Sequence, residues 1–262
     1  MTALRAAGCV YAEEEAALLQ ADTSGAGDLE LKLARRVAGE PLEQVLGWAE
    51  FHGLRLSVAP GVFVPRRRTE VLAGLAATLA RALDSDLDRP PVVVDLCCGT
   101  GAIGVAVADA VPGTELHAAD IDPDAVACAR LNVTMGRVHE GDLYDALPDD
   151  LRGRVDLLVV NAPYVPTHEI RLMPPEARLH EHRVALDGGA DGLDVHRRVA
   201  SGAPGWLTPG GSLLIETSPR QAADTTQLCT EAGLTVQVFG EDPARVVQAI
   251  SGAAGSSGTM AS

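Results

Sequence analysis

Four consecutive residues near the middle of the chain combine groups that could hold a planar nitrogen compound. Asn161, Ala162, Pro163 and Tyr164 follow directly on the apolar run VDLLVV. The side-chain carbonyl of Asn161 and the backbone carbonyl of Ala162 offer two acceptors for N–H groups. Pro163 disfavours the α conformation for the residue before it and so fixes the direction of that carbonyl. Tyr164 offers a ring face for stacking.

This combination suits methyl transfer to the nitrogen of an amide or of an aromatic amine. The lone pair of such a nitrogen is delocalised, so the nitrogen is a poor nucleophile. Two acceptors that hold its N–H groups would orient the lone pair and keep the reacting atoms at attack distance. An Asx-type turn followed by a core tyrosine explains the same four residues without any function. The choice between them depends on the elements around this corner.

A glycine-rich loop after an earlier apolar run, in VVVDLCCGTGAIG, indicates a bound nucleoside cofactor. Gly99, Gly101 and Gly104 fit the pattern G-x-G-x-x-G, in which glycines allow a tight turn and a close approach of the backbone to a ligand. Asp95, at the end of the run, would repel the pyrophosphate of NAD, which a helix N-terminus would otherwise suit. It suits the cationic amino-acid end of S-adenosylmethionine. The loop therefore favours S-adenosylmethionine, with an NAD-dependent oxidoreductase as the weaker alternative.

Two further acidic residues fit such a cofactor by their position. Asp120 ends the next expected strand, ELHAAD, where its carboxylate can accept hydrogen bonds from ribose hydroxyl groups. NAD would use the same group, so Asp120 supports a nucleoside without choosing between the two. Asp142, in EGDLYDAL, could accept a hydrogen bond from the adenine amino group, although an aspartate in a loop is more often a turn residue. Asp122 is expected to cap a helix that begins at Pro123.

The order of the elements predicts how these groups meet. From residue 92 to residue 250, apolar strand patterns alternate with helical patterns. This alternation predicts an α/β fold with a doubly wound, mostly parallel, seven-stranded Rossmann-like sheet. Ligands of such sheets bind beyond the carboxyl ends of the strands. The glycine loop, Asp120 and the corner at Asn161 are therefore expected to meet at one edge of the sheet.

The remaining segments predict smaller parts of the molecule. Residues 1–47 are expected to form a small helical N-terminal domain. Residues 48–91 are expected to form a linking β-hairpin with Gly53 at its bend, a helix with Thr69 as its N-cap, and a linker. Residues 251–262, SGAAGSSGTMAS, are small and polar and predict a disordered tail.

Composition limits the classes of function. The chain has 262 residues, and its net charge of −15 disfavours a nucleic-acid partner. No apolar run reaches the ~20 residues of a membrane helix, and the first residues lack the layout of a secretory signal, so a cytoplasmic protein is expected. The five cysteines form no pair of C-x-x-C units, which disfavours a disulfide framework and a zinc site. No metal is expected.

Together these motifs resemble those of the protein-(glutamine-N5) methyltransferases, whose known substrates include the GGQ glutamine of peptide chain release factors. The likeness runs from about Pro41 to Ile250 and includes PLEQVLGWAEFHGLRLSVAPGVFVPR, VVDLCCGTGAIGVAVA, ALDGGADGLD, and NAPY in place of N-P-P-Y. The resemblance implies that residues 161–164 hold the target glutamine and that the cofactor is S-adenosylmethionine. The residues expected to hold the cofactor are Asp95, Cys97, Cys98, Gly99, Thr100, Gly101, Asp120, Asp142, Leu143 and Asn161.

Three departures from the family pattern leave the methyl acceptor open. The family usually carries P-R-P-E-T-E where this chain has PRRRTE, so Arg67 and Arg68 replace a proline and an acid. The helical region before Pro41 is shorter than usual, and Ala162 replaces a proline. The favoured function is methyl transfer to a release factor glutamine. The alternatives are a small-molecule acceptor, a flipped nucleic-acid base, which the net charge disfavours, and a cofactor-binding homologue without catalysis.

Overall fold

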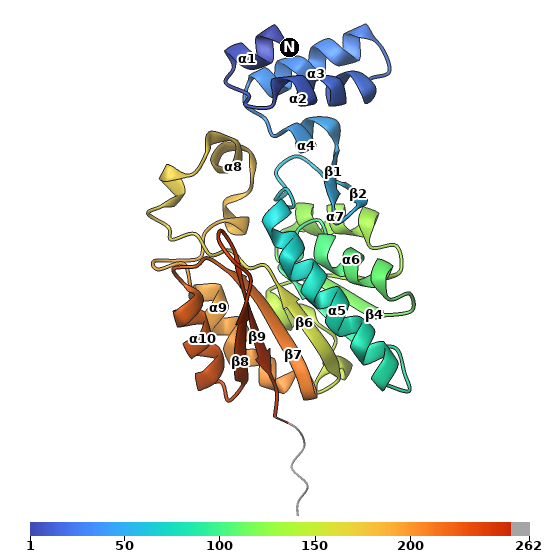
Figure 1. Ribbon diagram of the computed structural model, residues 1–262, viewed down its shortest axis with the longest axis vertical. Coiled ribbons are helices and arrows are strands. Elements are labelled where there is room, and N and C mark those ends of the chain that lie inside the picture. Colours follow the sequence, from blue (N-terminus) through green and yellow to red (C-terminus); the bar gives the residue numbers. More distant parts are fainter. Residues whose placement is uncertain (253–262) are drawn as a thin grey trace, which may run out of the picture.

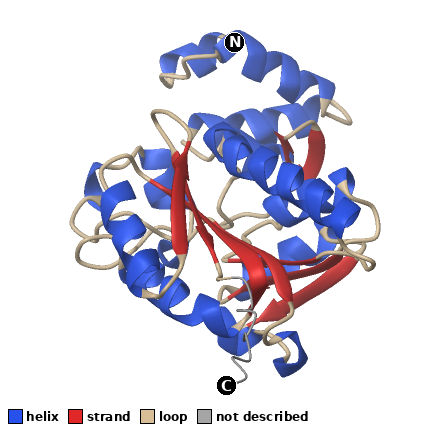
Figure 2. Cartoon of the chain, turned by 60° about the horizontal axis from the view of Figure 1, so that its bottom comes forward, coloured by secondary structure: helices blue, strands red, loops and turns tan. Residues whose placement is uncertain are grey.

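A mostly parallel sheet forms the centre of the molecule (Figures 1 and 2). In the computed structural model, which describes residues 1–252, seven strands follow the order β5-β4-β3-β6-β7-β9-β8. Strands β5, β4, β3, β6 and β7 run parallel to one another, and β9 runs antiparallel to its two neighbours, β7 and β8. The strands are β3 (Val92–Leu96), β4 (Glu115–Asp120), β5 (Gly136–Glu140), β6 (Val155–Val160), β7 (Leu207–Thr217), β8 (Thr235–Phe239) and β9 (Arg245–Ile250). The predicted fold class is confirmed. Residues 253–262 of the predicted tail lie outside the described residues.

Helices cover both faces of this sheet, as Figure 2 shows. One face carries α5 (Glu70–Asp86), α6 (Ala102–Ala110) and α7 (Pro123–Asn132), and the other carries α9 (Asp194–Gly202) and α10 (Ala222–Glu231). Successive residues of β3 point to opposite faces, so Val93 packs with α5 and α6 whereas Val94 packs with α9. Because both sides are buried, the central strands are continuous apolar runs instead of alternating ones.

The first part of the chain forms four helices and a hairpin, drawn at the blue end of the ribbon in Figure 1. They are α1 (Thr2–Ala6), α2 (Ala12–Ala21), α3 (Ala26–Val37), α4 (Leu42–Leu46), β1 (Trp48–Phe51) and β2 (Leu54–Ser57). Leu4, Leu19 and Val45 form a small apolar core among the helices. His52 and Gly53 both have positive φ, at 53° and 78°, as the tight turn of a two-residue hairpin requires. The predicted bend at Gly53 is therefore confirmed.

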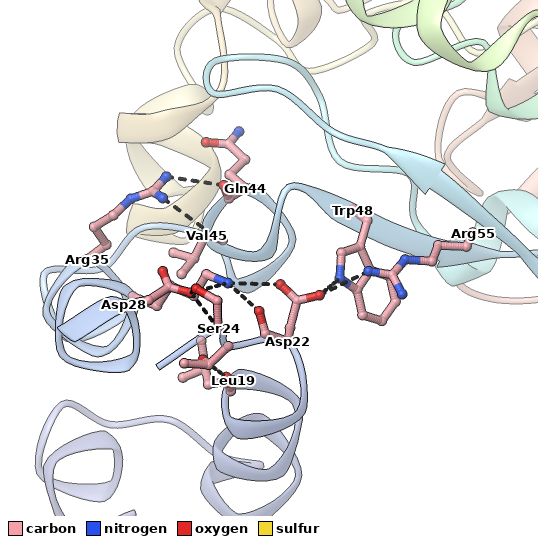
Figure 3. A network of polar contacts seen from close by, with 11 residues as sticks. Leu19, Asp22, Ser24, Asp28, Arg35, Gln44, Val45, Trp48 and Arg55 are labelled. Carbon is pink, nitrogen blue, oxygen red and sulfur yellow. Dashed lines mark hydrogen bonds and ion pairs between the residues drawn. The ribbon is translucent and has the colours of Figure 1, made fainter. Parts of the chain in front are cut away.

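Polar contacts join these helices to the hairpin (Figure 3). The Asp22 carboxylate accepts hydrogen bonds from the Trp48 indole N–H and from Arg55, both at 2.9 Å. Lys32 donates to the same carboxylate at 3.0 Å. Arg36, on α3, reaches across to Glu176 of α8 (Pro175–His180), with 2.6 Å between the charged atoms. Charged and polar groups therefore join the helical region to the hairpin and to α8.

No helix formed by residues 1–252 is long and apolar enough to cross a membrane.

Candidate functional site

A cavity opens at the carboxyl ends of β3, β4 and β6, the edge of the sheet at which ligands are expected. Of the residues predicted to do chemistry, those that line it are Cys97, Cys98, Gly99, Thr100, Asp120, Asn161, Ala162, Pro163 and Tyr164. A second cavity shares Cys97 and Asp120 and adds Asp142 and Leu143. The structure therefore brings these predicted residues together at one edge. Asp95 and Gly101 line neither cavity.

The glycine loop is shaped by left-handed backbone conformations. Cys97, Gly99 and Gly101 have φ values of 55°, 55° and 76°. A side chain at Gly101 would also place its Cβ 2.8 Å from Val133 Cγ2, so this position requires glycine for its space as well as for its backbone. A tight loop of this kind turns its backbone toward the cavity at the point where α6 begins.

Asp120 ties the glycine loop to the end of β4. Its Oδ2 accepts a hydrogen bond from the Gly99 N–H at 2.8 Å, and its Oδ1 accepts from the Asp122 N–H at 3.0 Å. Burial raises the pKa of Asp120, and the two backbone donors oppose this effect. The neighbouring Ile121 is 50% exposed and offers an apolar surface beside the carboxylate. A carboxylate, an apolar patch and bare backbone fit the ribose and base of a nucleoside.

Asp95 lies beneath the glycine loop instead of facing the cavity. It is fully buried, and its Oδ2 accepts a hydrogen bond from the Gly104 N–H at 2.9 Å. Its Oδ1 has no hydrogen-bond partner among the described residues. Burial raises the pKa of Asp95 to about 8. In this position Asp95 supports the loop from below, and its contact with a bound cation stays a prediction.

Asp142 and Leu143 border the second cavity. The Asp142 Oδ2 accepts a hydrogen bond from Arg198 of α9 at 2.8 Å. Leu143 has a φ of 51°, a conformation that is rare for a residue with a branched side chain. The backbone of this segment is therefore held in an unusual conformation next to Asp120, where the sequence predicts the base of the cofactor.

Asn161 follows β6 and points across to a segment far away in the sequence. Its Nδ2 donates a hydrogen bond to Thr69 Oγ1 at 3.3 Å. Thr69 ends a short 3₁₀ helix, η1 (Arg67–Thr69), which runs directly into α5. Thr69 is the N-cap residue of α5, as predicted, but its side chain makes no capping hydrogen bond to that helix. The hydroxyl group is engaged by Asn161 instead.

The acceptor atoms of the corner remain available. Within residues 1–252, no donor makes a hydrogen bond to Asn161 Oδ1 or to the Ala162 carbonyl. The backbone of Tyr164 is fixed, because its carbonyl accepts a hydrogen bond from Gln221 Nε2 at 3.0 Å. The Tyr164 hydroxyl accepts a hydrogen bond from Arg68 at 3.0 Å. Two unused carbonyl groups thus stand beside an aromatic ring with a fixed position.

Glu216 is a residue of this site to which the sequence analysis gave no role. It lies near the end of β7, directly after Ile215, which pairs with Val160. Glu216 is 1% exposed, and its two carboxylate oxygens have no hydrogen-bond partner within the described residues. The nearest charged atom is Arg68 Nε, at 3.7 Å. The available signal in the sequence was an acid at the end of the apolar run GSLLIET.

Asp122 has the capping role that the sequence predicts. Its Oδ1 accepts a hydrogen bond from the Asp124 N–H at 3.0 Å, and Pro123 opens α7. Its Oδ2 lies 2.7 Å from His182 Nδ1, and His182 Nε2 lies 3.8 Å from Asp124. Both ring nitrogens of His182 therefore face carboxylates, which ties the loop at residue 182 to α7. The expectation of no metal stays a prediction.

Comparisons of the sequence identify related proteins. The Methyltransferase small domain family matches residues 54–189. A release factor glutamine methyltransferase of Streptomyces coelicolor is 43% identical over 201 residues, which cover 76% of this chain and 70% of that protein. One of Geobacter sulfurreducens is 36% identical over 230 residues, covering 85% and 76%. A 4-amino-L-phenylalanine/4-methylamino-L-phenylalanine methyltransferase of Streptomyces pristinaespiralis is 38% identical over 201 residues, covering 76% and 68%.

Solved structures share the fold at lower sequence identity. A methyltransferase from Pyrococcus furiosus has a TM-score of 0.55 and 16% identity and covers 85% of this chain and 99% of that one. The 16S rRNA N2 G1207 methyltransferase of T. thermophilus, in complex with AdoMet and guanosine, has a TM-score of 0.55 and 20% identity, covering 78% and 49%. At these identities the likeness shows a common Rossmann-like methyltransferase fold.

Proposed function

Since the chain belongs to the protein-(glutamine-N5) methyltransferase family and is an S-adenosylmethionine-dependent enzyme, we propose that it methylates the GGQ glutamine of a peptide chain release factor. The methyl group goes to the side-chain amide nitrogen of that glutamine. Release factors act at the ribosome, so the proposal includes a cytoplasmic location.

The observation that carries the proposal is the pair of unused acceptors after β6. A primary amide has two N–H groups on one nitrogen, and the Asn161 Oδ1 and the Ala162 carbonyl are two acceptors on neighbouring residues. Hydrogen bonds to both would fix the plane of the amide and with it the direction of the nitrogen lone pair. Tyr164 would pack against the same plane. These residues position the amide.

The cofactor fits the neighbouring part of the cavity. Asp120 would accept hydrogen bonds from the ribose hydroxyl groups, and Ile121 would pack against the adenine ring. The loop from Cys97 to Gly101 would approach the cofactor with its backbone. When bound, S-adenosylmethionine supplies an electrophilic methyl group on a positively charged sulfur.

Residues 1–47 would recognise the release factor. Their surface exposes several large apolar side chains, among them Val10, Tyr11 and Leu31, which are 84%, 67% and 69% exposed. Arg36 links this region to Glu176 of α8, in the segment that leads to the cavity wall at Val184. A protein bound to the helices would therefore lie beside the entrance to the site.

The test is methyl transfer from labelled S-adenosylmethionine to a purified release factor, followed by mass spectrometry. We expect transfer to the GGQ glutamine alone, none to a release factor in which that glutamine is alanine, and none from the Asn161→Ala variant. Measurable cofactor binding without any transfer to the release factor would contradict the proposed acceptor.

A second acceptor class is supported by one observation at the cavity wall. Arg68, 38% exposed at its side chain, lines the cavity at the position where the family pattern has an acid. The relative named as a 4-amino-L-phenylalanine/4-methylamino-L-phenylalanine methyltransferase acts on an amino acid with an aromatic amine. A guanidinium group at this place would suit the carboxylate of such a small acceptor. Faster methyl transfer to 4-amino-L-phenylalanine than to the release factor, in the same assay, would favour this class.

A further inference from the structure

We propose that Arg68 is a positioning residue for methyl transfer, because its guanidinium group fixes the ring of Tyr164 beside the acceptor and is itself held by the buried carboxylate of Glu216. The inference rests on the proposed function in one respect, the packing of the Tyr164 ring against the plane of the acceptor. It applies to a glutamine amide and to an aromatic amine alike, since both groups are planar.

Contacts at both of its ends hold Tyr164 at the wall of the cavity. The backbone carbonyl accepts a hydrogen bond from Gln221 Nε2 at 3.0 Å, which fixes the main chain. The hydroxyl oxygen accepts a hydrogen bond from Arg68 Nη2, also at 3.0 Å, which fixes the direction of the ring axis. Without this second contact the ring could turn about its Cα–Cβ bond into another staggered rotamer. The place of the ring therefore depends on Arg68.

A buried carboxylate holds the Arg68 guanidinium group in turn. Glu216 Oε1 lies 3.7 Å from Arg68 Nε, so the ion pair and the hydrogen bond to Tyr164 use different nitrogens of one guanidinium group. Glu216 is 1% exposed, and salt screens such a buried charge much less than a charge at the surface. The Arg68 side chain, 38% exposed, could otherwise extend into solvent. Glu216 thus keeps Arg68 within reach of the Tyr164 hydroxyl group.

The backbone of η1 and the sheet bring these groups together and leave the neighbouring arginine outside. A 3₁₀ helix has three residues per turn, so successive side chains point about 120° apart. Arg68 lines the cavity, whereas Arg67 is exposed and does not line it. The pairing of Val160 with Ile215 places the segment after β6 beside Glu216. Arg67 is therefore a matched control for Arg68, of the same residue type and from the same short helix.

Loss of Arg68 has two consequences that can be separated by a second substitution. The Tyr164 ring loses the donor at its hydroxyl group, and Glu216 loses its counterion. A buried carboxylate without an opposite charge costs stability, which could lower the activity by itself. Glu216→Gln in the same chain removes this charge. The double variant Arg68→Met/Glu216→Gln should therefore regain stability relative to Arg68→Met, while the ring of Tyr164 stays free to turn.

The first experiment measures methyl transfer and urea unfolding in this set of variants. Arg68→Met should lower kcat/KM for the acceptor about tenfold, the size expected for one aromatic contact, and leave the Kd for S-adenosylmethionine unchanged. Arg68→Lys keeps a donor for the Tyr164 hydroxyl group and should recover part of the rate. The double variant should be as slow as Arg68→Met but unfold at a higher urea concentration. Arg67→Met should match the wild-type protein in both measurements.

A spectroscopic measurement makes the test independent of the acceptor. The chain has three tyrosines, so a protein labelled with ¹³C at the tyrosine Cζ gives three resonances, and Tyr164→Phe assigns that of Tyr164. Because Cζ carries the hydroxyl group, its resonance should shift when the donor from Arg68 is lost. We expect this shift in Arg68→Met and in the double variant, a smaller one in Glu216→Gln, and none in Arg67→Met.

The outcomes separate this inference from the proposed function. Absence of methyl transfer from the wild-type protein to the release factor would contradict that acceptor alone, because the resonance is recorded without any acceptor. An unchanged Tyr164 resonance in Arg68→Met would overturn the positioning role. A double variant that regains its rate together with its stability would overturn it too, since Arg68 would then only neutralise Glu216. A Glu216→Gln variant with the wild-type rate and resonance would contradict the part assigned to Glu216.

Discussion

The two sides of the cavity are built in different ways. On the cofactor side, the Asp120 carboxylate is held by the backbone N–H groups of Gly99 and Asp122. On the acceptor side, Asn161 is held by the side chain of Thr69, which comes from a segment 92 residues away. Backbone contacts within a strand–loop–helix unit survive most substitutions of neighbouring side chains. A contact between side chains of distant segments is lost when either side chain changes, so function should be most sensitive on the acceptor side.

The largest loss of activity is expected from a substitution on the acceptor side. Asn161→Ala removes the carbonyl that holds the acceptor, and we expect kcat to fall by about 10²- to 10³-fold, as for the loss of one positioned hydrogen-bonding group in other active sites. The measurement is methyl transfer at saturating cofactor. Calorimetric titration with S-adenosylmethionine is the control, and a loss of affinity as large as the loss of rate would place Asn161 on the cofactor side.

The cofactor side should respond in affinity more than in rate. Asp120→Asn removes the charge that would hold the ribose hydroxyl groups, and hydrogen bonds to charged groups contribute about 1.5–3 kcal/mol. We expect the Kd for S-adenosylmethionine to rise about 10- to 100-fold, with a kcat close to that of the wild type at saturation. Asp109→Asn, an exposed aspartate on α6, should change neither value. A lower kcat with an unchanged Kd would reverse the comparison between the two sides.

Acid pH is expected to lower the stability of the protein through a group outside the cavity, the buried His196. Burial of His196 lowers its pKa from the usual 6.5 to about 4. The unfolded chain therefore binds a proton first, so stability is complete above about pH 6.5 and is lost as the pH falls toward 4. Between pH 7.5 and 5 this one group should cost about 2 kcal/mol of the free energy of unfolding.

Urea unfolding at the two pH values measures this loss. His196→Asn, which carries no titrating group, should lose less stability on acidification than the wild-type protein. Equal losses in both proteins would assign the acid sensitivity to other groups, such as the buried His117. If activity falls at a pH where the protein is still folded, the cause lies at the site.

The smallest expected effect is a loss of stability when a side chain is added to the glycine loop on the cofactor side. Gly101→Ala places a Cβ 2.8 Å from Val133 Cγ2 in a left-handed conformation, and we expect a loss of about 1–3 kcal/mol in the free energy of unfolding. Gly153→Ala is the matched control, because φ at Gly153 is also positive, at 68°, but no atom lies within 4 Å of the added carbon. The difference in the free energy of unfolding between the two variants measures the cost of the contact between the added Cβ and Val133. Equal losses would mean that the loop accommodates this contact.

Local patterns in the sequence predicted the sheet, the glycine loop and the corner at Asn161. Each of these depends on apolar periodicity or on conformations that only a few residue types adopt. Such patterns could not predict which way the Asp95 side chain points, because β3 is buried on both faces and its apolar residues do not distinguish one face from the other. Asp95 shares the face of Val93 and so points under α6 instead of into the cavity.

The surroundings of Thr69 and Glu216 depend on how distant segments of the chain pack together. Thr69 has the residue type and the place of an N-cap, yet its hydroxyl is used by Asn161 because η1 brings it against the end of β6. Glu216 looks like a charge that ends an apolar strand. Only the neighbouring position of β6 and β7 in the sheet shows that it lies beside the acceptor side.

The chain has two tryptophans, one beside the N-terminal helices and one packed against the central sheet. The fluorescence of each tryptophan can therefore report on its own part of the molecule. Trp48 stands at the junction of the helices and the hairpin, where its indole N–H donates to Asp22 and the Arg55 guanidinium lies 4.0 Å from its ring. Trp206 is 2% exposed beneath the sheet and stacks on Tyr144. A protein that docks on the helices and moves them would change the emission of Trp48 and leave that of Trp206 as an internal reference. The Trp48→Phe variant would separate the two signals.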